Sequence, residues 1–363
     1  MAVQRLAIVG TGLMGASIGL AAKRTGVERV TGFDADAEAL ACAAERGAID
    51  ESASSVEEAV RGAELAVVAV PVASLARQVE EAVAAGGDAT VTDVGSTKGA
   101  VVAAAAGEAR FIGGHPVCGS EAHGPAHARA DLFGGASWFL TPLPQTSPEA
   151  HRLVHGFVSS LGATPVAVDP VVHDRLVALT SHLPHALANV LLNQAGGSRI
   201  DGHEPLAAAG GSLRDMTRVA GANPRIWVDI FLENAGALRE ALGEHRRRIE
   251  QLENALDAGD AGFLARWIAE AARHRGQMLA RAFPDPGELQ QLRVRVPDRP
   301  GVLAGITQAL GAERINIEDF ELRHVSPERG GTLTLFVSGE GEAERAAKLL
   351  EEQGYGVEIA PVL

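Results

Sequence analysis

The sequence predicts an α/β protein in which a doubly wound domain is followed by an all-helical domain and then by a small βαββαβ domain. Three observations support this prediction. Apolar, β-branched runs alternate with helical stretches through the first half of the chain, they disappear after about residue 170, and strand-like runs return from residue 289 onward. We therefore expect domains at residues 1–169, 170–283 and 289–363.

The strands of the first domain are predicted from apolar runs that are nearly continuous rather than alternating. Such runs are typical of strands that helices cover on both faces, as in a parallel sheet with crossover helices. The predicted strands lie at residues 4–9, 29–33, 65–70, 90–94, 110–112, 137–140 and 164–168.

The second and third domains are predicted from changes in the same pattern. Ala-, Leu- and Arg-rich stretches at 228–256 and 260–282 have the helical period, and the Pro- and Gly-containing segment 283–287 indicates a linker. The elements that follow are predicted as a strand at 290–296, a helix to about residue 311, strands at 314–323 and 331–338, a helix at 342–353 and a strand at 355–360. This order is that of a ferredoxin-like module.

Composition and charge argue against several classes of protein. The 363 residues include 32 Lys plus Arg and 46 Asp plus Glu, and the formal net charge of −14 argues against a nucleic-acid partner, which would require a basic surface. No apolar run approaches the roughly 20 residues of a membrane-spanning helix. Two cysteines, Cys42 and Cys118, are too few for a disulfide framework. We therefore expect a soluble protein of a reducing compartment, the cytoplasm.

A glycine motif, GTGLMG at residues 10–15, follows the first predicted strand and opens a helix. Its first glycine permits a tight turn, its second lets the backbone approach a pyrophosphate, and its third allows the helix to pack closely on the strand. Asp34 ends the second strand, where a carboxylate can accept hydrogen bonds from both ribose hydroxyls and would repel a 2′-phosphate. The motif therefore predicts a Rossmann-type NAD site; the alternative is an ordinary glycine-rich α/β turn. The residues expected to bind the cofactor are Gly10, Gly12, Leu13, Met14, Gly15 and Asp34.

Two further motifs follow strands at the carboxyl edge of the predicted sheet, where ligands of such sheets gather. In DVGSTK at residues 93–98, Ser96 could donate a hydrogen bond to a substrate hydroxyl or to a catalytic base, or could cap the next helix. In GGHPVCGSEAHG at residues 113–124, a neutral His115 could accept a proton from a hydroxyl while a hydride leaves the same carbon. The alternative is a structural histidine in a turn.

The helical domain carries two motifs, SHLPH at residues 181–185 and DMTR at residues 215–218. Two histidines three residues apart could share a helix face, although Pro184 ends or kinks that helix. Substrate hydrogen bonding by His185 is favoured over metal ligation because no third ligand stands at a matching short spacing, so no metal is expected; a polar core histidine is the alternative. Arg218 offers a planar fork for a carboxylate, or forms a surface ion pair of little energetic weight.

These motifs, taken together, resemble those of the prephenate dehydrogenases, the TyrA group. GTGLMGAS, DVGSTK, GHPVCGSEAHG, SHLPH and DMTR occur in this order, and the resemblance covers about residues 4–282. The tail, with VRVPDRPGVLAGIT at residues 294–307 and INI at residues 315–317, resembles an ACT domain, which binds small effectors, usually amino acids. The resemblance implies oxidative decarboxylation of prephenate to 4-hydroxyphenylpyruvate, with hydride transfer to NAD+, in tyrosine biosynthesis.

The resemblance also implies roles for individual residues in this reaction. His115 would bond the ring hydroxyl and act as the base, and Ser96 would orient that hydroxyl and the nicotinamide. Four residues would contact the substrate or line its pocket. Arg218 would bind a substrate carboxylate and His185 would help to position the substrate. Glu121 would lie near the mouth of the pocket, and Trp227 would form part of its wall.

For the third domain, the resemblance implies regulation by feedback. Asp298 and Gly301 in its first turn, and Asn316 at the start of its second strand, stand where such modules offer groups to an effector. Tyrosine is the expected effector. A homodimer formed through the helical domain is implied in the same way.

Three other functions stay open from the sequence. The chain could be an arogenate or cyclohexadienyl dehydrogenase, acting on a substrate that carries an amine where prephenate carries a keto group. It could be a 3-hydroxyacid dehydrogenase-like enzyme, since these share the order of a nucleotide domain and a helical domain, although they usually rely on a catalytic lysine. It could also be a non-catalytic amino-acid sensor.

Overall fold

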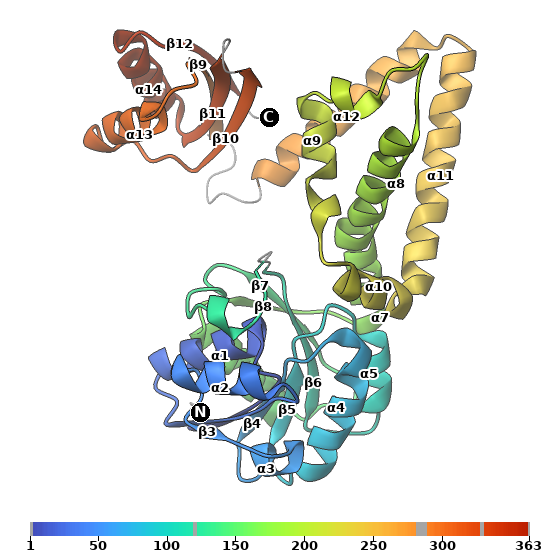
Figure 1. Cartoon of the computed structure of the whole chain (residues 1–363), viewed down its shortest axis with the longest axis vertical. Helices are drawn as coiled ribbons and strands as arrows, with labels where there is room; N and C mark the ends of the chain where they lie inside the picture. The colour runs from blue at the N-terminus through green and yellow to red at the C-terminus, as the bar shows by residue number, and fades with distance from the viewer. Residues whose placement is uncertain (1–2, 119–121, 281–288, 327–329, 362–363) are drawn as a thin grey trace. The chain divides into compact units, whose positions relative to one another are not determined.

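The computed structural model describes residues 3–118, 122–280, 289–326 and 330–361 (Figure 1). By its internal contacts the chain divides into two units, Met1–Gln194 with Arg218–His245 and Ala195–Thr217 with Arg246–Leu363. The three predicted domain boundaries remain predictions, and the predicted linker at 283–287 lies outside the described residues.

A sheet of eight strands forms the centre of the first unit, in the order β3-β2-β1-β4-β5-β6-β7-β8. Every pair of neighbouring strands is parallel except β6 and β7, which are antiparallel. The strands are β1 (Arg5–Val9), β2 (Arg29–Phe33), β3 (Glu51–Ser52), β4 (Leu65–Val68), β5 (Thr90–Asp93), β6 (Phe111–Pro116), β7 (Ser137–Thr141) and β8 (Thr164–Ala167).

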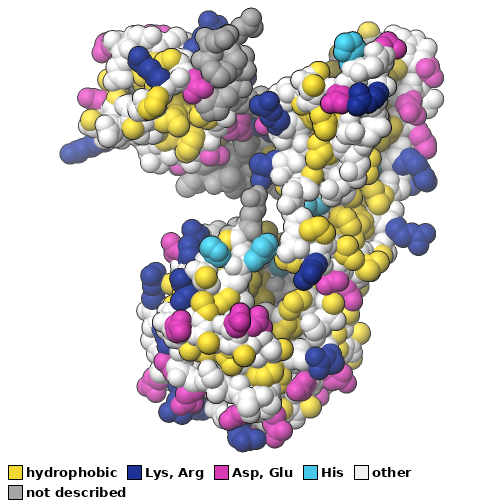
Figure 2. Space-filling view, in the orientation of Figure 1, with side chains coloured by type: hydrophobic (Ala, Val, Ile, Leu, Met, Phe, Trp, Pro, Cys, Tyr) yellow, Lys and Arg dark blue, Asp and Glu magenta, His cyan; other side chains and the backbone are white. Residues whose placement is uncertain are grey.

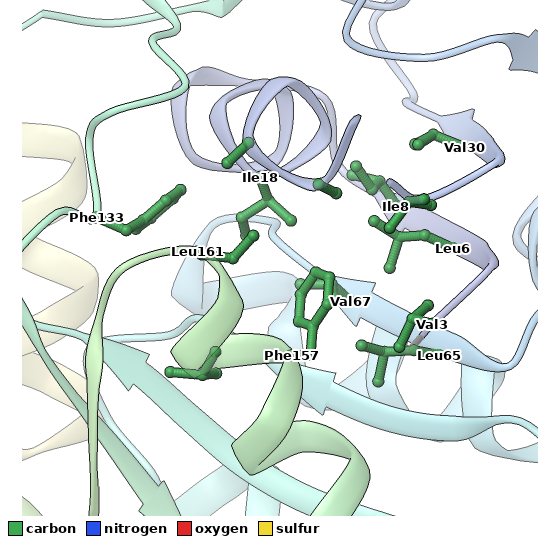
Figure 3. Packing of buried hydrophobic residues seen from close by; sticks show 14 of the residues in the cluster. Val3, Leu6, Ile8, Ile18, Val30, Leu65, Val67, Phe133, Phe157 and Leu161 are labelled. Atoms are coloured by element: carbon green, nitrogen blue, oxygen red, sulfur yellow. The ribbon is translucent and has the colours of Figure 1, made fainter. Parts of the chain in front are cut away.

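Helices cover both faces of this sheet, which is why its central strands carry continuous apolar runs. On one face, Ile18 and Phe157 from two helices pack over Leu6 and Ile8 of β1 (Figure 3). A second cluster, which includes Val79 and other buried apolar residues, lies against the same strands. The helices of this domain are α1 (Leu13–Arg24), α2 (Ala37–Glu45), α3 (Val56–Val60), α4 (Val72–Ala85), α5 (Gly99–Ala104), η1 (Pro125–His127) and α6 (Pro148–Ser160).

Two strands differ from their predicted bounds. Strand β3 was not expected, because its two residues, Glu51 and Ser52, are exposed and give no apolar signal. Strand β6 extends past the predicted end at residue 112 because Gly113 to Pro116 pair with β7. His115 therefore lies within a strand, opposite Phe139, and not in the turn that follows one.

The helical segment after the sheet begins with α7 (Pro170–Val177), a π-helical turn η2 (Ala178–His182) and α8 (Leu183–Gly197). Of the two alternatives predicted for Pro184, an end or a kink of the helix, the structure excludes the end, because helical structure continues through it. Proline lacks the backbone N–H group that a regular α-helix uses. A wider π-helical turn lies immediately before Pro184, where the regular α-helical hydrogen-bond pattern is already changed. Helix α7, the turn η2 and helix α8 therefore form one continuous helical element, which carries both His173 and His185.

One helical stretch predicted from the sequence is interrupted in the structure. The stretch 228–256 is not a single helix, because Asn234 closes α10 with φ −103° and ψ 26° before α11 begins. The elements are η3 (Pro205–Ala208), α9 (Gly211–Thr217), η4 (Arg218–Gly221), α10 (Pro224–Glu233), α11 (Ala235–Asp257) and α12 (Ala261–Ala280). In the part of the chain that the structure covers, no helix has both the length and the apolar character needed to cross a bilayer.

The C-terminal domain has a four-stranded antiparallel sheet in the order β10-β11-β9-β12. Leu292 and Leu335 of this sheet form one core with Ile306 and Leu350 of its two helices. The elements are β9 (Leu289–Val296), α13 (Val302–Ala312), β10 (Asp319–Ser326), β11 (Gly330–Ser338), α14 (Glu340–Glu352) and β12 (Gly356–Pro361).

The predicted start of its second strand, at residue 314, is wrong. Arg314 has a left-handed backbone with φ 58°, and β10 begins only at Asp319. The apolar signal of this region comes from Ile315 and Ile317, which pack into the domain core from the connection before the strand.

Candidate active site

The turn between β1 and α1 is tightly packed everywhere except at its second glycine. Gly10 has φ +94°, and a Cβ atom there would lie 2.5 Å from the carbonyl oxygen of Ala69. A Cβ atom on Gly15 would lie 1.9 Å from the carbonyl oxygen of Gly10. At Gly12, by contrast, no atom lies within 4 Å of such a Cβ. The turn thus leaves open space at the start of α1, where unpaired N–H groups favour an anion.

A cleft of about 760 Å³ opens beside this turn and is lined by Gly10, Gly12 and Asp34. The Asp34 carboxylate accepts the backbone N–H of Thr11 at 2.6 Å and that of Asp36 at 2.9 Å. The Thr11 hydroxyl donates to the same carboxylate at 3.2 Å. A carboxylate has about four acceptor positions, so about one position remains for a ribose hydroxyl. The unpaired N–H groups at the start of α1, the open space at Gly12 and the acceptor Asp34 together fit a dinucleotide.

The cleft is acidic where the adenosine end of a dinucleotide would lie. Asp36 and Glu38 line it together with Asp34, and the cation Arg77 in its wall lies 3.6 Å from Glu81. Leu13 and Met14 form the first turn of α1 and are half-buried, and Met14 packs against the main core. Their role at the cofactor remains a prediction.

A buried ion pair fixes the backbone immediately before His115. Lys98 and Asp93 have fully buried side chains and contact each other. The Asp93 carboxylate accepts the N–H of Gly114 at 3.0 Å, and the Lys98 ammonium donates to the Gly114 carbonyl at 2.7 Å. Burial lowers the pKa of Lys98, while the charge of Asp93 opposes that shift. The pair therefore holds both backbone polar groups of one residue of β6, Gly114.

The half-buried His115 ring contacts a second histidine from α7. Its Nδ1 atom lies 2.9 Å from Nε2 of His173, and Nδ1 of His173 lies 2.9 Å from Oδ1 of Asp174. Phe139 packs edge-on to His173, with 5.3 Å between the ring centroids. The sequence analysis did not single out His173 or Asp174.

Asp174 also caps the helix that follows the DVGSTK motif. Its two carboxylate oxygens accept the N–H of Lys98 at 2.8 Å and of Gly99 at 2.9 Å. The N-cap position of α5 is Lys98, so the alternative that Ser96 caps this helix is wrong. Ser96 lies half-buried in the loop between β5 and α5, and its proposed catalytic role remains a prediction.

Around the π-helical turn, three predicted residues come together. The ring of His185 stacks on Trp227 with 3.4 Å between centroids, and His182 meets the same indole edge-on at 6.0 Å. Asn234 links this cluster to α7, because its amide nitrogen donates to the Asp174 carbonyl at 2.8 Å and lies 3.2 Å from Nδ1 of His182. The motif SHLPH therefore supplies both a buried histidine, His182, and a half-buried histidine, His185, that stacks on Trp227.

Burial lowers the pKa values of three histidines of this region, His115, His182 and His185. Burial, reinforced by His173, Lys98 and His182, lowers the pKa of His115 well below its ordinary value of 6.5. Burial also lowers the pKa of His182 to about 4. For His185, burial and the positive charge of the exposed Arg218 lower the pKa. Arg218 is thus close enough to act electrostatically on the His185–Trp227 stack.

The other predicted residues are placed as follows. Glu121 lies outside the described residues. Gly301 has φ +88° and precedes α13, and the exposed Asp298 lies in the same turn. Asn316 does not start the second strand of its domain but lies in the connection before β10, where its amide donates to Glu318 at 2.9 Å. Across the described part of the chain, no group of three or more His, Cys, Asp or Glu side chains is arranged to hold a metal ion.

Comparison with known proteins matches three family models to this chain. The nucleotide-binding domain of prephenate dehydrogenase matches residues 18–167, its dimerization domain matches residues 169–270, and the ACT domain matches residues 290–354. The prephenate dehydrogenase of Bacillus subtilis (strain 168) is 32% identical over 353 residues, which cover 95% of each chain.

Two further relatives cover most of the first two domains. The cyclohexadienyl dehydrogenase of Zymomonas mobilis is 30% identical over 278 residues, covering 75% of this chain and 95% of its own. The crystal structure of the Aquifex aeolicus prephenate dehydrogenase with hydroxyphenyl propionate and NAD+ has a TM-score of 0.72 and 28% identity, covering 77% of this chain and 99% of its own.

These comparisons confirm the predicted fold class, the NAD-dependent dehydrogenase class and NAD as the cofactor. They also agree with the site, because Asp34 of the cleft and the half-buried His115 lie in the segment that matches the nucleotide-binding domain, and the glycine turn precedes that segment. The chain belongs to the prephenate dehydrogenase family and carries an ACT domain at its C-terminal end.

Proposed function

We propose that this chain converts prephenate to 4-hydroxyphenylpyruvate and CO2, with NAD+ as the hydride acceptor. The observation that carries the proposal is the placement of the His115 imidazole, which is held on a strand by a buried ion pair and by a contact with His173. Burial lowers the pKa of this imidazole, which favours its neutral form. A neutral imidazole with one nitrogen engaged by the protein can serve a substrate hydroxyl with the other. We assign this role to Nε2 of His115.

In this mechanism His115 accepts the proton of the ring hydroxyl as the hydride leaves the same carbon. Loss of the ring carboxylate as CO2 supplies the electron pair that makes the ring aromatic, and His115 returns the proton to the phenol oxygen. NAD+, when bound, supplies the hydride acceptor. Ser96, in the loop after β5, orients the hydroxyl, and the chain's main contribution is to position and to stabilise charge.

Arg218 and the His185–Trp227 stack form the proposed binding site for the anionic part of the substrate. An exposed guanidinium offers two parallel donors to a carboxylate. The neutral His185 can donate to a second oxygen while Trp227 provides an apolar wall. Glu121 is assigned to the mouth of this pocket by family resemblance alone.

The test is a matrix of substrates and cofactors. Prephenate and arogenate are each assayed with NAD+ and NADP+ by NADH or NADPH absorbance and by chromatography of the product. We expect the highest kcat/KM for prephenate with NAD+. Turnover of arogenate alone would replace the proposal by the second candidate, an arogenate or cyclohexadienyl dehydrogenase, which the Zymomonas mobilis relative favours. Absence of turnover with either substrate would reject both.

We expect Asp34→Asn to weaken discrimination between the two cofactors. The substitution keeps the shape of the side chain but removes the charge that would repel a 2′-phosphate. A hydrogen bond to a charged group contributes about 1.5–3 kcal/mol, so we expect the ratio of kcat/KM for NADP+ over NAD+ to rise about tenfold or more. Asp36→Asn is the matched control, because Asp36 also lines the cleft but its carboxylate caps α2. An equal change in both variants would contradict the assignment of Asp34.

We expect catalysis to persist into mildly acidic solution. Because the pKa of His115 lies well below 6.5, the imidazole keeps its basic form until the pH falls through that lowered value. The acidic limb of the kcat/KM profile for prephenate should therefore have its midpoint below pH 6.5. A midpoint at or above this value would show that His115 titrates as an exposed histidine.

We propose that tyrosine binds the ACT domain and inhibits the enzyme. Asp298, Gly301 and Asn316 are the assigned contacts, since Gly301 opens α13 with a left-handed backbone and leaves its first turn accessible. Inhibition requires that tyrosine bind one conformational state better than another.

We expect tyrosine to lower the rate and to raise the thermal midpoint, and Asp298→Ala or Asn316→Ala to weaken both effects. Glu344→Ala on the exposed face of α14 is the control. Phenylalanine and tryptophan are the comparison ligands. If tyrosine changes neither quantity, the proposed regulation is wrong.

We also propose that the chain forms a homodimer through its helical domain and works in the cytoplasm. Apolar side chains gather over these helices (Figure 2); Val190 of α8 is 60% exposed and Leu232 of α10 is 71% exposed. Exposed apolar patches mark interaction surfaces, and this segment matches the dimerization model. Cys42 and Cys118, both free, suit a reducing compartment.

A further inference from the structure

We infer that His173 and Asp174 are positioning residues that fix the tautomer and the orientation of His115. The inference deepens the proposed function, because it explains how the buried imidazole presents a lone pair to the substrate hydroxyl. It rests on a continuous row of three side chains, His115, His173 and Asp174, joined by two contacts of 2.9 Å.

The direction of the hydrogen bonds follows from the last member of the row. Asp174 accepts the backbone N–H groups of Lys98 and Gly99, as an ionised carboxylate does, and an ionised carboxylate only accepts hydrogen bonds. Nδ1 of His173 must therefore carry the proton of the contact with Asp174. In the neutral form of His173, which the inference assigns, the lone pair then lies on Nε2.

This lone pair determines the state of His115. Nε2 of His173 faces Nδ1 of His115, so Nδ1 of His115 must donate and must hold the single proton of the neutral ring. Nε2 of His115 consequently carries the lone pair. If the hydrogen bonds of this row ran in the opposite direction, Nε2 of His115 would present an N–H group to the substrate hydroxyl and could not accept its proton.

Packing fixes the ring planes as well as the protons. His115 and His173 meet nearly edge-on, with an interplanar angle of 75° and 5.1 Å between centroids. Phe139 lies opposite His115 in the pairing of β6 with β7. Its ring packs against the His173 ring with an interplanar angle of 82°. His173 is fully buried, so water does not compete for its nitrogens.

Asp174 is itself anchored from two sides. Its carboxylate holds the start of α5, and its carbonyl accepts the amide of Asn234. The side chain is only 14% exposed. When His115 accepts a proton at Nε2, the imidazolium keeps its Nδ1–H bond to His173, and the Asp174 carboxylate at the end of the row stabilises the positive charge. No proton needs to travel along the row.

The test combines kinetics with nitrogen NMR. His173→Phe removes the acceptor but keeps an aromatic ring, whereas His173→Gln retains an oxygen that can accept from Nδ1 of His115. Loss of such an orienting partner commonly costs about 10- to 100-fold in related sites. We expect a loss of this size in kcat for His173→Phe, with the KM for prephenate and the affinity for NAD+ nearly unchanged. His173→Gln should recover most of the loss.

The control is His155→Gln, which replaces an exposed histidine of α6 and should leave kcat unchanged. In ¹⁵N-labelled protein, long-range proton–nitrogen spectra report which ring nitrogen of His115 is protonated. We expect the Nδ1–H form in the unmodified protein and in His173→Gln, and an increased share of the Nε2–H form in His173→Phe.

Two results would overturn the inference. One is an Nε2–H tautomer of His115 in the unmodified protein, which is measurable even if a variant fails to fold. The other is a His173→Phe variant with unchanged kcat and tautomer. The NMR result does not depend on the substrate, so a failure of the proposed reaction would appear separately, as absence of prephenate turnover with the Nδ1–H tautomer intact.

Discussion

Replacing His115 with Asn is expected to lower kcat for prephenate by about 10²- to 10⁴-fold, the usual contribution of a general base. Asn is polar and smaller than the imidazole, and it cannot accept and return a proton. The loss should appear in kcat, because the dinucleotide cleft is lined by other residues and does not include position 115. Steady-state NADH formation measures the rate, and titration calorimetry measures the affinity for NAD+.

The matched control for this prediction is His123→Asn, which changes an exposed histidine beyond the same strand. We expect kcat close to that of the unmodified enzyme. If His115→Asn retained more than about a tenth of the activity, a general base at this position would be excluded, since such a loss is smaller than general bases contribute.

Replacing Lys98 with Met is expected to lower the free energy of unfolding by about 3–5 kcal/mol. The substitution keeps the apolar stem but leaves the Asp93 carboxylate buried without its cation. Removing one member of a buried ion pair costs more than the pair contributes, because the remaining charge is desolvated. Urea denaturation followed by circular dichroism measures the change.

Two comparisons make this prediction specific. Lys23→Met removes the cation of a more exposed pair with Asp50, in which the side chains are 27% and 39% exposed, and should cost less than about 1 kcal/mol. The double variant Asp93→Asn with Lys98→Met removes both charges and should recover part of the loss. If Lys98→Met and Lys23→Met lowered the free energy of unfolding equally, burial of the Lys98–Asp93 pair would not explain the effect.

Much of the fold follows from local patterns in the sequence. The buried strand β4 and most of β1 are continuous apolar runs. In the glycine turn before α1, the first and third glycines have no room for a Cβ atom and the second has open space, as the motif predicts. His115, His185 and Trp227 were also predicted from motifs, because motif residues stand next to strand ends or helix turns. Local signals therefore locate many of the elements, while the roles of the predicted site residues remain predictions.

The connections between these residues could not be predicted from local signals. His173 and Asp174 follow the sheet domain by only a few residues, yet their partners are His115 and the start of α5, 58 and 76 residues away in sequence. Asn234 marks only a break between α10 and α11 in the sequence, but it joins Asp174 to His182. The adjacent His173 and Asp174 in the short helix α7 are the one signal that could have indicated such a role.

Two local preferences of the chain are overridden in the structure. Pro184 alone favours an end or a kink of the helix, but the helix continues through it, with a π-helical turn immediately before it. Ile315 and Ile317 indicate a strand, but they are apolar because the connection packs into the core. In both cases tertiary context overrides a local preference.

The central claim is most directly tested by a crystal structure of this protein with NAD+ and a 4-hydroxyphenyl analogue of the product. The account predicts that Nε2 of His115 lies within hydrogen-bonding distance, about 2.6–3.2 Å, of the ring hydroxyl oxygen, with Nδ1 still on His173. A His115 ring turned away from both ligands toward bulk water would contradict it.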